Sequence, residues 1–270
     1  MALDRRKFIK IAGLSTLVGL MGKQSFSVGG ESDSKYSYGD ERLHGERWAM
    51  VIDLKKCKNG DGCEMDCKKS CHALHNVPTI EESRHEIKWL WLEEYDNAFP
   101  TQENEFNKQD LLHSKVPVLC NHCDHPPCVK VCPTQATWKR EDGIVMMDWH
   151  RCIGCRYCIT ACPYGSRSFN WFDPVARDEK GGIEKDQQYF DEIKPIFPTR
   201  SKGVVEKCTF CDERLARGQK PACVEACQEG AMVFGDIEDP NSEVRQILHD
   251  RFSIRRKPGL GTQPQIYYLI

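Results

Sequence analysis

The hydrophobic pattern of the chain predicts short strands beside its cysteine-rich stretches. Residues 137–148, TWKREDGIVMMD, place short apolar runs on either side of Asp142-Gly143, a dipeptide that favours a tight turn. Residues 231–236, AMVFGD, form another apolar run. We therefore expect a hairpin at 137–148 and a strand at 231–236.

Two further patterns predict regular structure elsewhere. Apolar and polar residues alternate from Ile87 to Trp91, which predicts a strand. Residues 241–252, NSEVRQILHDRF, predict an amphipathic helix capped by Ser242, and such a helix more often packs against its own protein than binds a partner. No apolar run reaches the roughly 18–20 residues of a membrane span, so we expect the body of the chain to be soluble.

The apolar run at the N-terminus follows a pair of arginines. Residues 4–22, DRRKFIKIAGLSTLVGLMG, place Arg5 and Arg6 before a run of apolar and small residues that begins at Ile11. This order resembles a twin-arginine export signal, and the alternative is a frayed amphipathic helix. It predicts a periplasmic or extracytoplasmic protein. The sequence SFS at 25–27 is a poor cleavage site, so cleavage and retention as an anchor both stay open.

Cysteine dominates the candidate chemistry. The 38 basic and 40 acidic residues nearly balance, which argues against a nucleic-acid-binding protein. A count of 16 cysteines is typical of a disulfide framework, a zinc scaffold or redox-active metal sites. Export after folding favours the last, because a cofactor can be loaded onto reduced thiols before transport. The cysteines form groups of four at 57–71, 120–132, 152–162 and 208–227.

The third group has the spacing of a bacterial two-cluster ferredoxin. Its sequence, CIGCRYCITACP, is the run C-x2-C-x2-C-x3-C-P that holds [4Fe-4S] clusters. Gly154 allows the backbone to approach a cluster closely. In such ferredoxins the last cysteine, here Cys162 before Pro163, ligates the other cluster, so a partner group is required.

The second group supplies that partner. Its sequence, CNHCDHPPCVKVCP, is C-x2-C-x4-C-x3-C-P, so the two groups predict one ferredoxin-like module with two sets of ligands. Set A comprises Cys120, Cys123, Cys128 and Cys162, and set B comprises Cys132, Cys152, Cys155 and Cys158.

The first and fourth groups follow the same logic with longer loops. In the fourth group eleven residues separate the two pairs of cysteines, and Gln228 replaces the usual proline. The first group, C-x5-C-x3-C-x3-C, leaves two registers open: a longer loop, which we favour, or Gly60 in place of a ligand with Cys71 unused. With the longer loop, set C comprises Cys71, Cys208, Cys211 and Cys223, and set D comprises Cys57, Cys63, Cys67 and Cys227.

Other side chains near the cysteines have competing interpretations. Arg214, Arg217 and Lys220 in the fourth group either offset the charge of a cluster or are solvated. Nearby histidines are not needed as ligands, because sixteen thiolates satisfy four clusters. The tryptophans either shield clusters from water or form ordinary core. These are His72, His75, His122 and His125, and Trp89, Trp91, Trp138, Trp149 and Trp171.

The cysteine motifs resemble those of the ferredoxin-like iron-sulfur subunits of the dimethyl-sulfoxide-reductase type. The matching stretches are CNHCDHPPCVKVCPTQA, DWHRCIGCRYCITACPYGSRSF and KCTFCDERLARGQKPACVEAC, and the resemblance covers 48–236. It implies an α+β fold of tandem ferredoxin-like modules (2x[4Fe-4S]) with loop insertions, and four [4Fe-4S] clusters with the sixteen cysteines as iron ligands. Within that family the leader, RWAMVIDLKKC, CHALHNVP, HEIKWLW and GTQPQIYYLI resemble DsrO, the periplasmic subunit of the sulfite-reductase-linked membrane complex.

The resemblance also implies a function. It predicts an electron-transfer subunit of an oxidoreductase complex, with no catalytic residues and no small-molecule substrate of its own. The implied partners are an integral membrane quinone-interacting subunit and a periplasmic multihaem cytochrome c, in a respiratory complex of dissimilatory sulfur metabolism. The alternatives are a polysulfide-, nitrite- or hydrogenase-linked complex, or a zinc-binding structural protein.

The motifs and the composition between them predict the domain organisation. A twin-arginine signal segment precedes one iron-sulfur domain, in which charged, Gly- and Pro-containing stretches read as surface insertions. The boundaries are 1–30 for the signal, 31–270 for the domain, 117–172 for a central module, 48–78 plus 204–236 for an outer module, 79–116 and 173–203 for insertions, and 237–270 for a C-terminal extension.

Overall fold

The structure is a computed structural model that describes residues 41–57, 66–102, 114–173, 197–198 and 200–270. The predicted twin-arginine leader, Cys63 and most of the insertion predicted at 173–203 lie outside these residues. The described chain contains both helices and strands, as expected for the α+β class. None of its described helices is long and apolar enough to cross a membrane.

The largest sheet joins the two ends of the described chain. Strand β1 pairs in parallel with β10 and antiparallel with β8, and β9 pairs with the far edge of β10. The register places Met50 opposite Ile266 on one side and opposite Phe234 on the other. The bounds are β8 Met232–Asp236, β1 Trp48–Asp53, β10 Ile266–Leu269 and β9 Ser253–Ile254.

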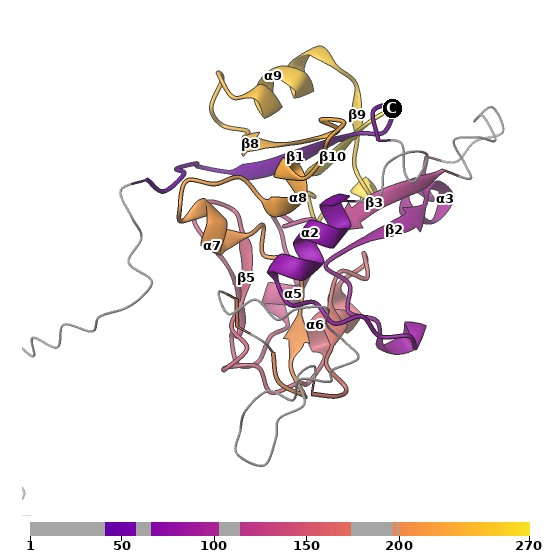
Figure 1. Ribbon diagram of the computed structural model, residues 1–270, viewed down its shortest axis with the longest axis vertical. Helices are drawn as coiled ribbons and strands as arrows, with labels where there is room; N and C mark the ends of the chain where they lie inside the picture. The colour runs from indigo at the N-terminus through magenta and orange to yellow at the C-terminus, as the bar shows by residue number, and fades with distance from the viewer. Residues whose placement is uncertain (1–40, 58–65, 103–113, 174–196, 199) are drawn as a thin grey trace, which may run out of the picture. The chain divides into compact units, whose positions relative to one another are not determined.

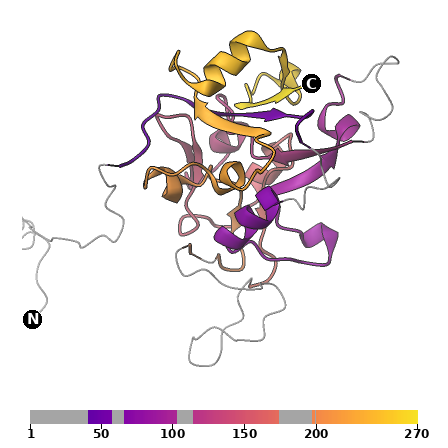
Figure 2. The ribbon, with the colours of Figure 1, turned by 45° about the horizontal axis from the view of Figure 1, so that its top comes forward.

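Strand β1 is buried on both faces of this sheet. Met50 and Ile52 point into the main core, whereas Ala49 and Val51 pack with Val244 of helix α9 (Glu243–Asp250). Because alternate residues of a strand face opposite sides, the six residues of β1 contribute to the apolar layers on both faces of the sheet. Figure 1 and Figure 2 show α9 on one side of the sheet, with α2 (Asp66–Leu74) and α8 (Ala222–Glu225) on the other.

Two of the predicted elements form within one or two residues of the predicted bounds. Helix α9 begins after Ser242, whose hydroxyl accepts a hydrogen bond from the Arg245 backbone N–H at 3.2 Å. It packs against the sheet, as expected for a helix of the protein's own core. The run at 231–236 forms β8.

Three two-stranded sheets complete the described β structure. The hairpin predicted at 137–148 is confirmed, with Lys139 opposite Val145 across the Asp142-Gly143 turn. The other two pairs, β2 with β3 and β6 with β7, join segments further apart in the chain. The bounds are β2 Leu90–Glu94, β3 Lys115–Leu119, β4 Thr137–Lys139, β5 Val145–Met147, β6 Ser168–Phe169 and β7 Val205–Glu206.

The strand predicted from Ile87 starts later than expected. It begins at Leu90, although Ile87 and Trp89 are fully buried. Trp89 is held by its side chain, because its indole N–H donates to the Glu206 carboxylate at 2.7 Å and its ring stacks on His75. The alternation therefore predicted the burial of Ile87 and Trp89 correctly, but it placed the start of the strand too early.

The helices beside the cysteines are short. Helices α5, α7 and α8 contain four residues each, and α2 is the longest of this group. The bounds of the remaining helices are α3 Tyr95–Ala98, α5 Pro127–Lys130, α6 Tyr157–Ala161 and α7 Asp212–Leu215, with 3-10 turns η1 at Ser83–His85 and η2 at Pro258–Leu260.

The cysteine loops share a backbone conformation. In the second, third and fourth groups, the residue before the second cysteine is left-handed, with φ of 39° at His122, 69° at Gly154 and 58° at Phe210. The residue three positions after the last cysteine of these groups is left-handed as well: Gln135, Gly165 and Gly230. Since left-handed backbone is unfavourable for most residues, its recurrence at equivalent positions indicates that the three groups adopt one local structure.

Candidate metal centres

Set A surrounds one small cavity. Cys120, Cys123, Cys128 and Cys162 all line it, together with Pro126 and other neighbours. The first three cysteines are buried. Burial raises the pKa of the Cys123 thiol, and neighbouring Cys120 raises it further. The structure thus brings together the same four side chains that the ferredoxin spacing predicts.

Set B surrounds a second cavity. Cys132, Cys152, Cys155 and Cys158 line it together with Gly154. Gly154 has φ of +69°, and a Cβ at this position would lie 2.3 Å from the carbonyl oxygen of Gly203. A side chain at this position would therefore clash with the Gly203 backbone. The expectation that Gly154 lets the backbone approach a cluster stays a prediction. Cys155 is exposed, which places this set nearest to the surface.

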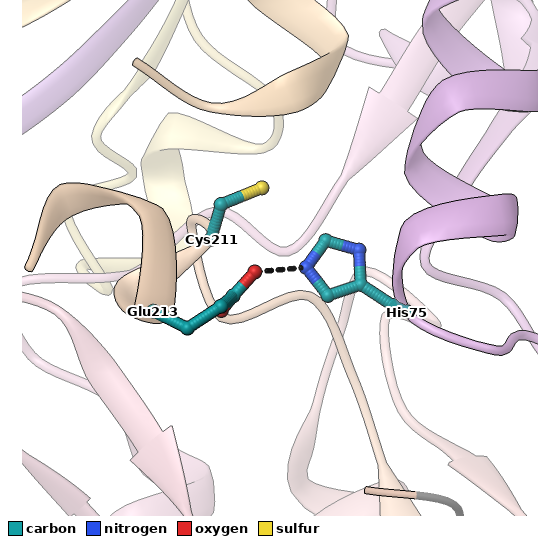
Figure 3. A group of neighbouring side chains, drawn as sticks. All are labelled: His75, Cys211 and Glu213. Atoms are coloured by element: carbon teal, nitrogen blue, oxygen red, sulfur yellow. Dashed lines mark hydrogen bonds and ion pairs between the residues drawn. The ribbon is translucent and has the colours of Figure 1, made fainter. Parts of the chain in front are cut away.

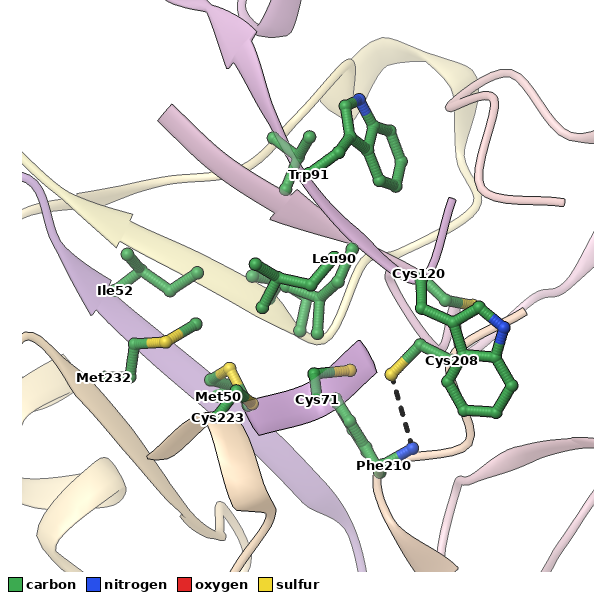
Figure 4. Close-up of a cluster of buried hydrophobic side chains, with 14 of the residues drawn as sticks. Met50, Ile52, Cys71, Leu90, Trp91, Cys120, Cys208, Phe210, Cys223 and Met232 are labelled. Atoms are coloured by element: carbon green, nitrogen blue, oxygen red, sulfur yellow. Dashed lines mark hydrogen bonds between the residues drawn. The ribbon is translucent and has the colours of Figure 1, made fainter. Parts of the chain in front are cut away.

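Set C lies inside the main hydrophobic core. Cys71 from α2, Cys208 and Cys223 are core residues, and Figure 4 shows them among Met50, Leu90 and Met232. Burial raises the pKa of the Cys71 thiol well above its usual range, and the nearby Cys211, Cys208 and Cys223 raise it further. All four predicted members of this set therefore lie close to one another.

Set D is described only in part. Cys67 on α2 and Cys227 after α8 both pack against the main core, on two helices that contact each other. Cys57 lies four residues after the end of β1, and its N–H donates to the Asp53 carbonyl oxygen at 3.0 Å. Because Cys63 lies outside the described residues, the completeness of this set stays a prediction.

Hydrogen-bond donors point at the sulfur atoms of several sets. Backbone N–H groups donate to the sulfurs of Cys152, Cys208, Cys211 and Cys227 at 3.3–3.5 Å. Burial raises the pKa of Cys132, but N–H and hydroxyl donors from Thr137 and Thr134 lower it below its usual value. Such donors favour thiolate over thiol, which is the form that binds iron.

The donor set and its surroundings fit iron-sulfur clusters. All fifteen cysteines in the described part of the chain are free of disulfide bonds. Four sulfurs around one cavity, with N–H donors at the sulfurs, is the arrangement that [4Fe-4S] clusters use. An exported disulfide framework is not supported, because these thiols gather in fours rather than in bonded pairs.

The sets follow one another through the molecule. Cys67 of set D and Cys71 of set C act on each other electrostatically on α2. Cys208 of set C and Cys120 of set A also interact electrostatically. Burial, together with the charge of Cys120, raises the pKa of Cys208 to about 12. Cys128 of set A likewise acts on Cys158 of set B. The resulting order is D, C, A, B.

An aromatic contact joins sets C and A. His122, between two cysteines of set A, stacks on Phe210, between two cysteines of set C, with ring centroids 3.7 Å apart. The Nδ1 atom of His122 accepts a hydrogen bond from the Val145 N–H at 3.1 Å. Burial holds the pKa of His122 well below its usual value, so the ring is neutral. The ring thus packs between the loops of the two sets, and the interpretation that it is not a ligand stays a prediction.

A second histidine forms part of a possible ion site. His75, Cys211 and Glu213 offer ligand atoms within 4.8 Å of one another (Figure 3). His75 Nδ1 donates to the Cys71 carbonyl oxygen at 2.8 Å, and its Nε2 lies 2.9 Å from a Glu213 oxygen. Both nitrogens are thus engaged, and Cys211 belongs to set C. We interpret this group as a hydrogen-bonded support for set C rather than a separate centre.

The structure bears on two questions that the sequence left open, the loop cations and the tryptophans. Arg217 and Lys220 are exposed, as the solvated interpretation expects, whereas Arg214 is partly buried, pairs with Glu225 and donates to the Lys220 carbonyl oxygen. Trp138 and Trp171 are 38% and 41% exposed, so neither is a core residue. Trp89 and Trp91 are core residues.

Sequence reasoning missed the cations that do lie inside. Arg167 and Lys207 are buried beside the cysteine sets. A signal was available, because Arg167 stands five residues after Cys162 and Lys207 immediately precedes Cys208, both inside the cysteine motifs of the family.

A single substitution distinguishes the two registers of the first group. We expect Cys71→Ser to lose or convert one cluster and to leave sets A and B intact, because Cys71 lies among the other members of set C. Iron content and low-temperature electron paramagnetic resonance of the variant measure this. Full iron content with unchanged spectra would instead support the register in which Cys71 is unused.

Comparison with known proteins gives a consistent result. The family model of the 4Fe-4S dicluster domain matches residues 111–190 and 193–237. The chain is 39% identical to the Hdr-like menaquinol oxidoreductase iron-sulfur subunit 1 of Archaeoglobus fulgidus, over 98% of this chain and 97% of that protein.

Two further relatives come from bacteria. The menaquinone reductase iron-sulfur cluster-binding subunit of Nitratidesulfovibrio vulgaris is 38% identical, over 83% of this chain and 88% of that protein. The tetrathionate reductase of Salmonella typhimurium has a subunit that is 37% identical, over 88% of this chain and 79% of that protein.

Proposed function

The chain belongs to the family of iron-sulfur subunits of oxidoreductase complexes with 4Fe-4S dicluster domains, and from this we propose that it carries four [4Fe-4S] clusters in two tandem ferredoxin-like modules. As a member it binds [4Fe-4S] clusters and serves as an electron-transfer subunit, not as the catalytic one. The clusters, when bound, supply one-electron exchange at potentials that the surrounding protein sets.

The order of the cysteine sets is the observation that carries this proposal. Among the described cysteines, each set lies next to another, from set D through C and A to B, and sets A, B and C each join cysteines that are distant in sequence. A scaffold of independent zinc knots would not require this adjacency, whereas electron transfer between clusters does.

The proposed modules follow from the same assembly. The central module, 117–172, provides sets A and B, and the outer module, 48–78 plus 204–236, provides sets C and D. The recurring left-handed residues support a common loop structure in both modules. The sixteen cysteines are the proposed ligands.

The proposed partners are a quinone-interacting membrane subunit and other redox subunits of a respiratory complex. Two of the relatives carry menaquinol or menaquinone in their names, and one belongs to a tetrathionate reductase, which supports a link to quinones and to sulfur compounds. From the resemblance to DsrO we also propose a multihaem cytochrome c as a partner and a role in dissimilatory sulfur metabolism. Purification of the intact complex from membranes, with identification of its subunits, tests this; a protein isolated without a membrane subunit would contradict it.

The proposed location is the extracytoplasmic face of the membrane. The paired arginines at Arg5 and Arg6 and the apolar run after them support it. Cell fractionation is expected to recover the protein outside the cytoplasm, and recovery of the mature protein from the cytoplasm alone would contradict it.

Metal analysis tests the four-cluster proposal. Anaerobically purified protein is expected to contain about sixteen irons and as many acid-labile sulfides per chain, with interacting cubane signals after reduction. About eight irons per chain would fit two clusters and thus only one of the two proposed modules. Zinc in place of iron would overturn it in favour of a structural protein.

A further inference from the structure

Arg167 is a buried cation between two cysteine sets. The residue is 4% exposed, and its Nη2 atom donates to the Cys128 sulfur of set A at 3.1 Å and to the Thr137 hydroxyl at 2.8 Å. The thiolates that act on it electrostatically are Cys128 and Cys120 of set A and Cys158 of set B. Its guanidinium group therefore lies where these two sets meet.

Lys207 occupies the corresponding place between sets A and C. It is fully buried, and its ammonium group donates to the carbonyl oxygens of Val145 and Cys208. Its charge acts on Cys208 of set C and on His122, which lies between two cysteines of set A, and Val145 lines the cavity of set A. Glu206, its neighbour on strand β7, is engaged elsewhere by Arg200 at 2.6 Å.

Neither cation has a carboxylate partner. Within the residues that the structure describes, Arg167 and Lys207 form no ion pair with Asp or Glu. A buried charge without a counter-charge is strongly unfavourable. The anionic groups within reach are the cysteine thiolates, and a cluster held by four thiolates carries net negative charge.

We propose that Arg167 and Lys207 are positioning residues that balance the negative charge of the clusters on either side of them and thereby raise the reduction potentials of sets A, B and C. This inference rests on the proposed function. Reduction adds one negative charge to a cluster, so a nearby fixed cation stabilises the reduced form more than the oxidised form. The low polarity of the buried site strengthens the effect.

Neutral variants of similar size test the proposal. Arg167→Met and Lys207→Met, purified anaerobically as full chains, are titrated with redox mediators and followed by electron paramagnetic resonance, with iron and sulfide measured in parallel. Each is expected to keep its iron and to shift the oxidised-to-reduced ratio of an adjacent cluster at least tenfold toward the oxidised form, which is about 59 mV for a one-electron couple. Arg167→Lys and Lys207→Arg keep the charge and are expected to restore most of the potential.

The controls separate this inference from the proposed function. Arg251→Met removes a cation that already pairs with Asp53. It is expected to leave the oxidised-to-reduced ratio of every cluster within twofold of the wild-type ratio. Full iron content with unchanged potentials in both Met variants would overturn the inference alone. If a Met variant loses iron, recovery of iron in the charge-conserving variant supports charge balance, and continued loss overturns it. Wild-type protein without iron would overturn the proposed function itself.

Discussion

Removal of iron from the intact protein is expected to abolish its cooperative thermal unfolding transition. The proposed ligands Cys71, Cys120, Cys208 and Cys223 belong to the main hydrophobic core, so loss of the clusters would open the centre of the protein. Structural zinc sites contribute about 10–16 kcal/mol to folding. Net stabilities of native domains are only about 5–15 kcal/mol, so the loss of even one comparable site removes most of the margin.

The secondary structure around the cysteines cannot replace that contribution. Helices α5, α7 and α8 contain four residues each, far below the roughly 12–15 residues at which an isolated helix becomes marginally stable. The left-handed His122 and Phe210 each cost on the order of 1–3 kcal/mol unless their surroundings hold them. These loops therefore depend on ligation for their conformation.

Hydrogen exchange and calorimetry measure the effect on protein treated anaerobically with an iron chelator. Amide protection is expected to disappear first in the cysteine loops at 120–132, 152–162 and 208–227. It should persist longest in β1 and β10, which share a separate apolar layer with α9. Reconstitution with iron and sulfide should restore the transition, and a magnesium-saturated chelator is the control. An iron-free protein with unchanged protection in the loops would contradict the prediction.

The composition of sets A and B could be predicted because it depends on local geometry. A C-x2-C loop with a left-handed third residue can present its sulfurs in few ways, and the fourth ligand follows from the ferredoxin rule. The structure places Cys162 with Cys120, Cys123 and Cys128 around one cavity, as expected. The 137–148 hairpin could be predicted for the same reason, since the Asp-Gly turn fixes its register.

The four-stranded sheet could not be predicted in the same way. The parallel pairing of Met50 with Ile266 joins distant segments, and neither segment has a turn that would specify its partner. Because β1 is buried on both faces, its pattern is a continuous apolar run without alternation. The sequence analysis accordingly predicted neither β1 nor β10.

The buried charges were missed for a related reason. A cation in a motif gives no sign of whether its side chain points inward, and composition favours the solvated interpretation. The loop cations Arg217 and Lys220 are at the surface, whereas Arg167, Arg200 and Lys207 are enclosed. Their burial depends on partners contributed by distant parts of the chain.

Glu206→Gln is expected to destabilise the protein by about 3–5 kcal/mol, the usual cost of breaking a buried ion pair from one side. Arg200 and Glu206 are both fully enclosed, with Nη2 and Oε2 2.6 Å apart. The carboxylate also accepts hydrogen bonds from Trp89 at 2.7 Å and Asn170 at 2.6 Å. Neutralising it would leave the guanidinium group without a counter-charge among the rings of Trp89 and Phe197.

The same pair holds two parts of set C in place. Arg200 donates to the backbone carbonyls of His75 and Asn76, just after the helix that carries Cys71, while Glu206 stands two residues before Cys208. We therefore expect Glu206→Gln to loosen the cluster of set C before those of sets A and B. Chemical denaturation of the holoprotein measures the stability, and electron paramagnetic resonance reports which cluster is lost first.

A matched surface pair provides the control for Glu206→Gln. Arg47 and Glu238 form an ion pair whose side chains are 33% and 40% exposed. Exposed pairs contribute only about 0–1 kcal/mol, so Glu238→Gln should leave both the unfolding midpoint and the cluster signals almost unchanged. If both substitutions lowered the stability and changed the cluster signals equally, burial would not explain the contribution of the Arg200–Glu206 pair. The proposed role of that pair in holding set C would then be contradicted.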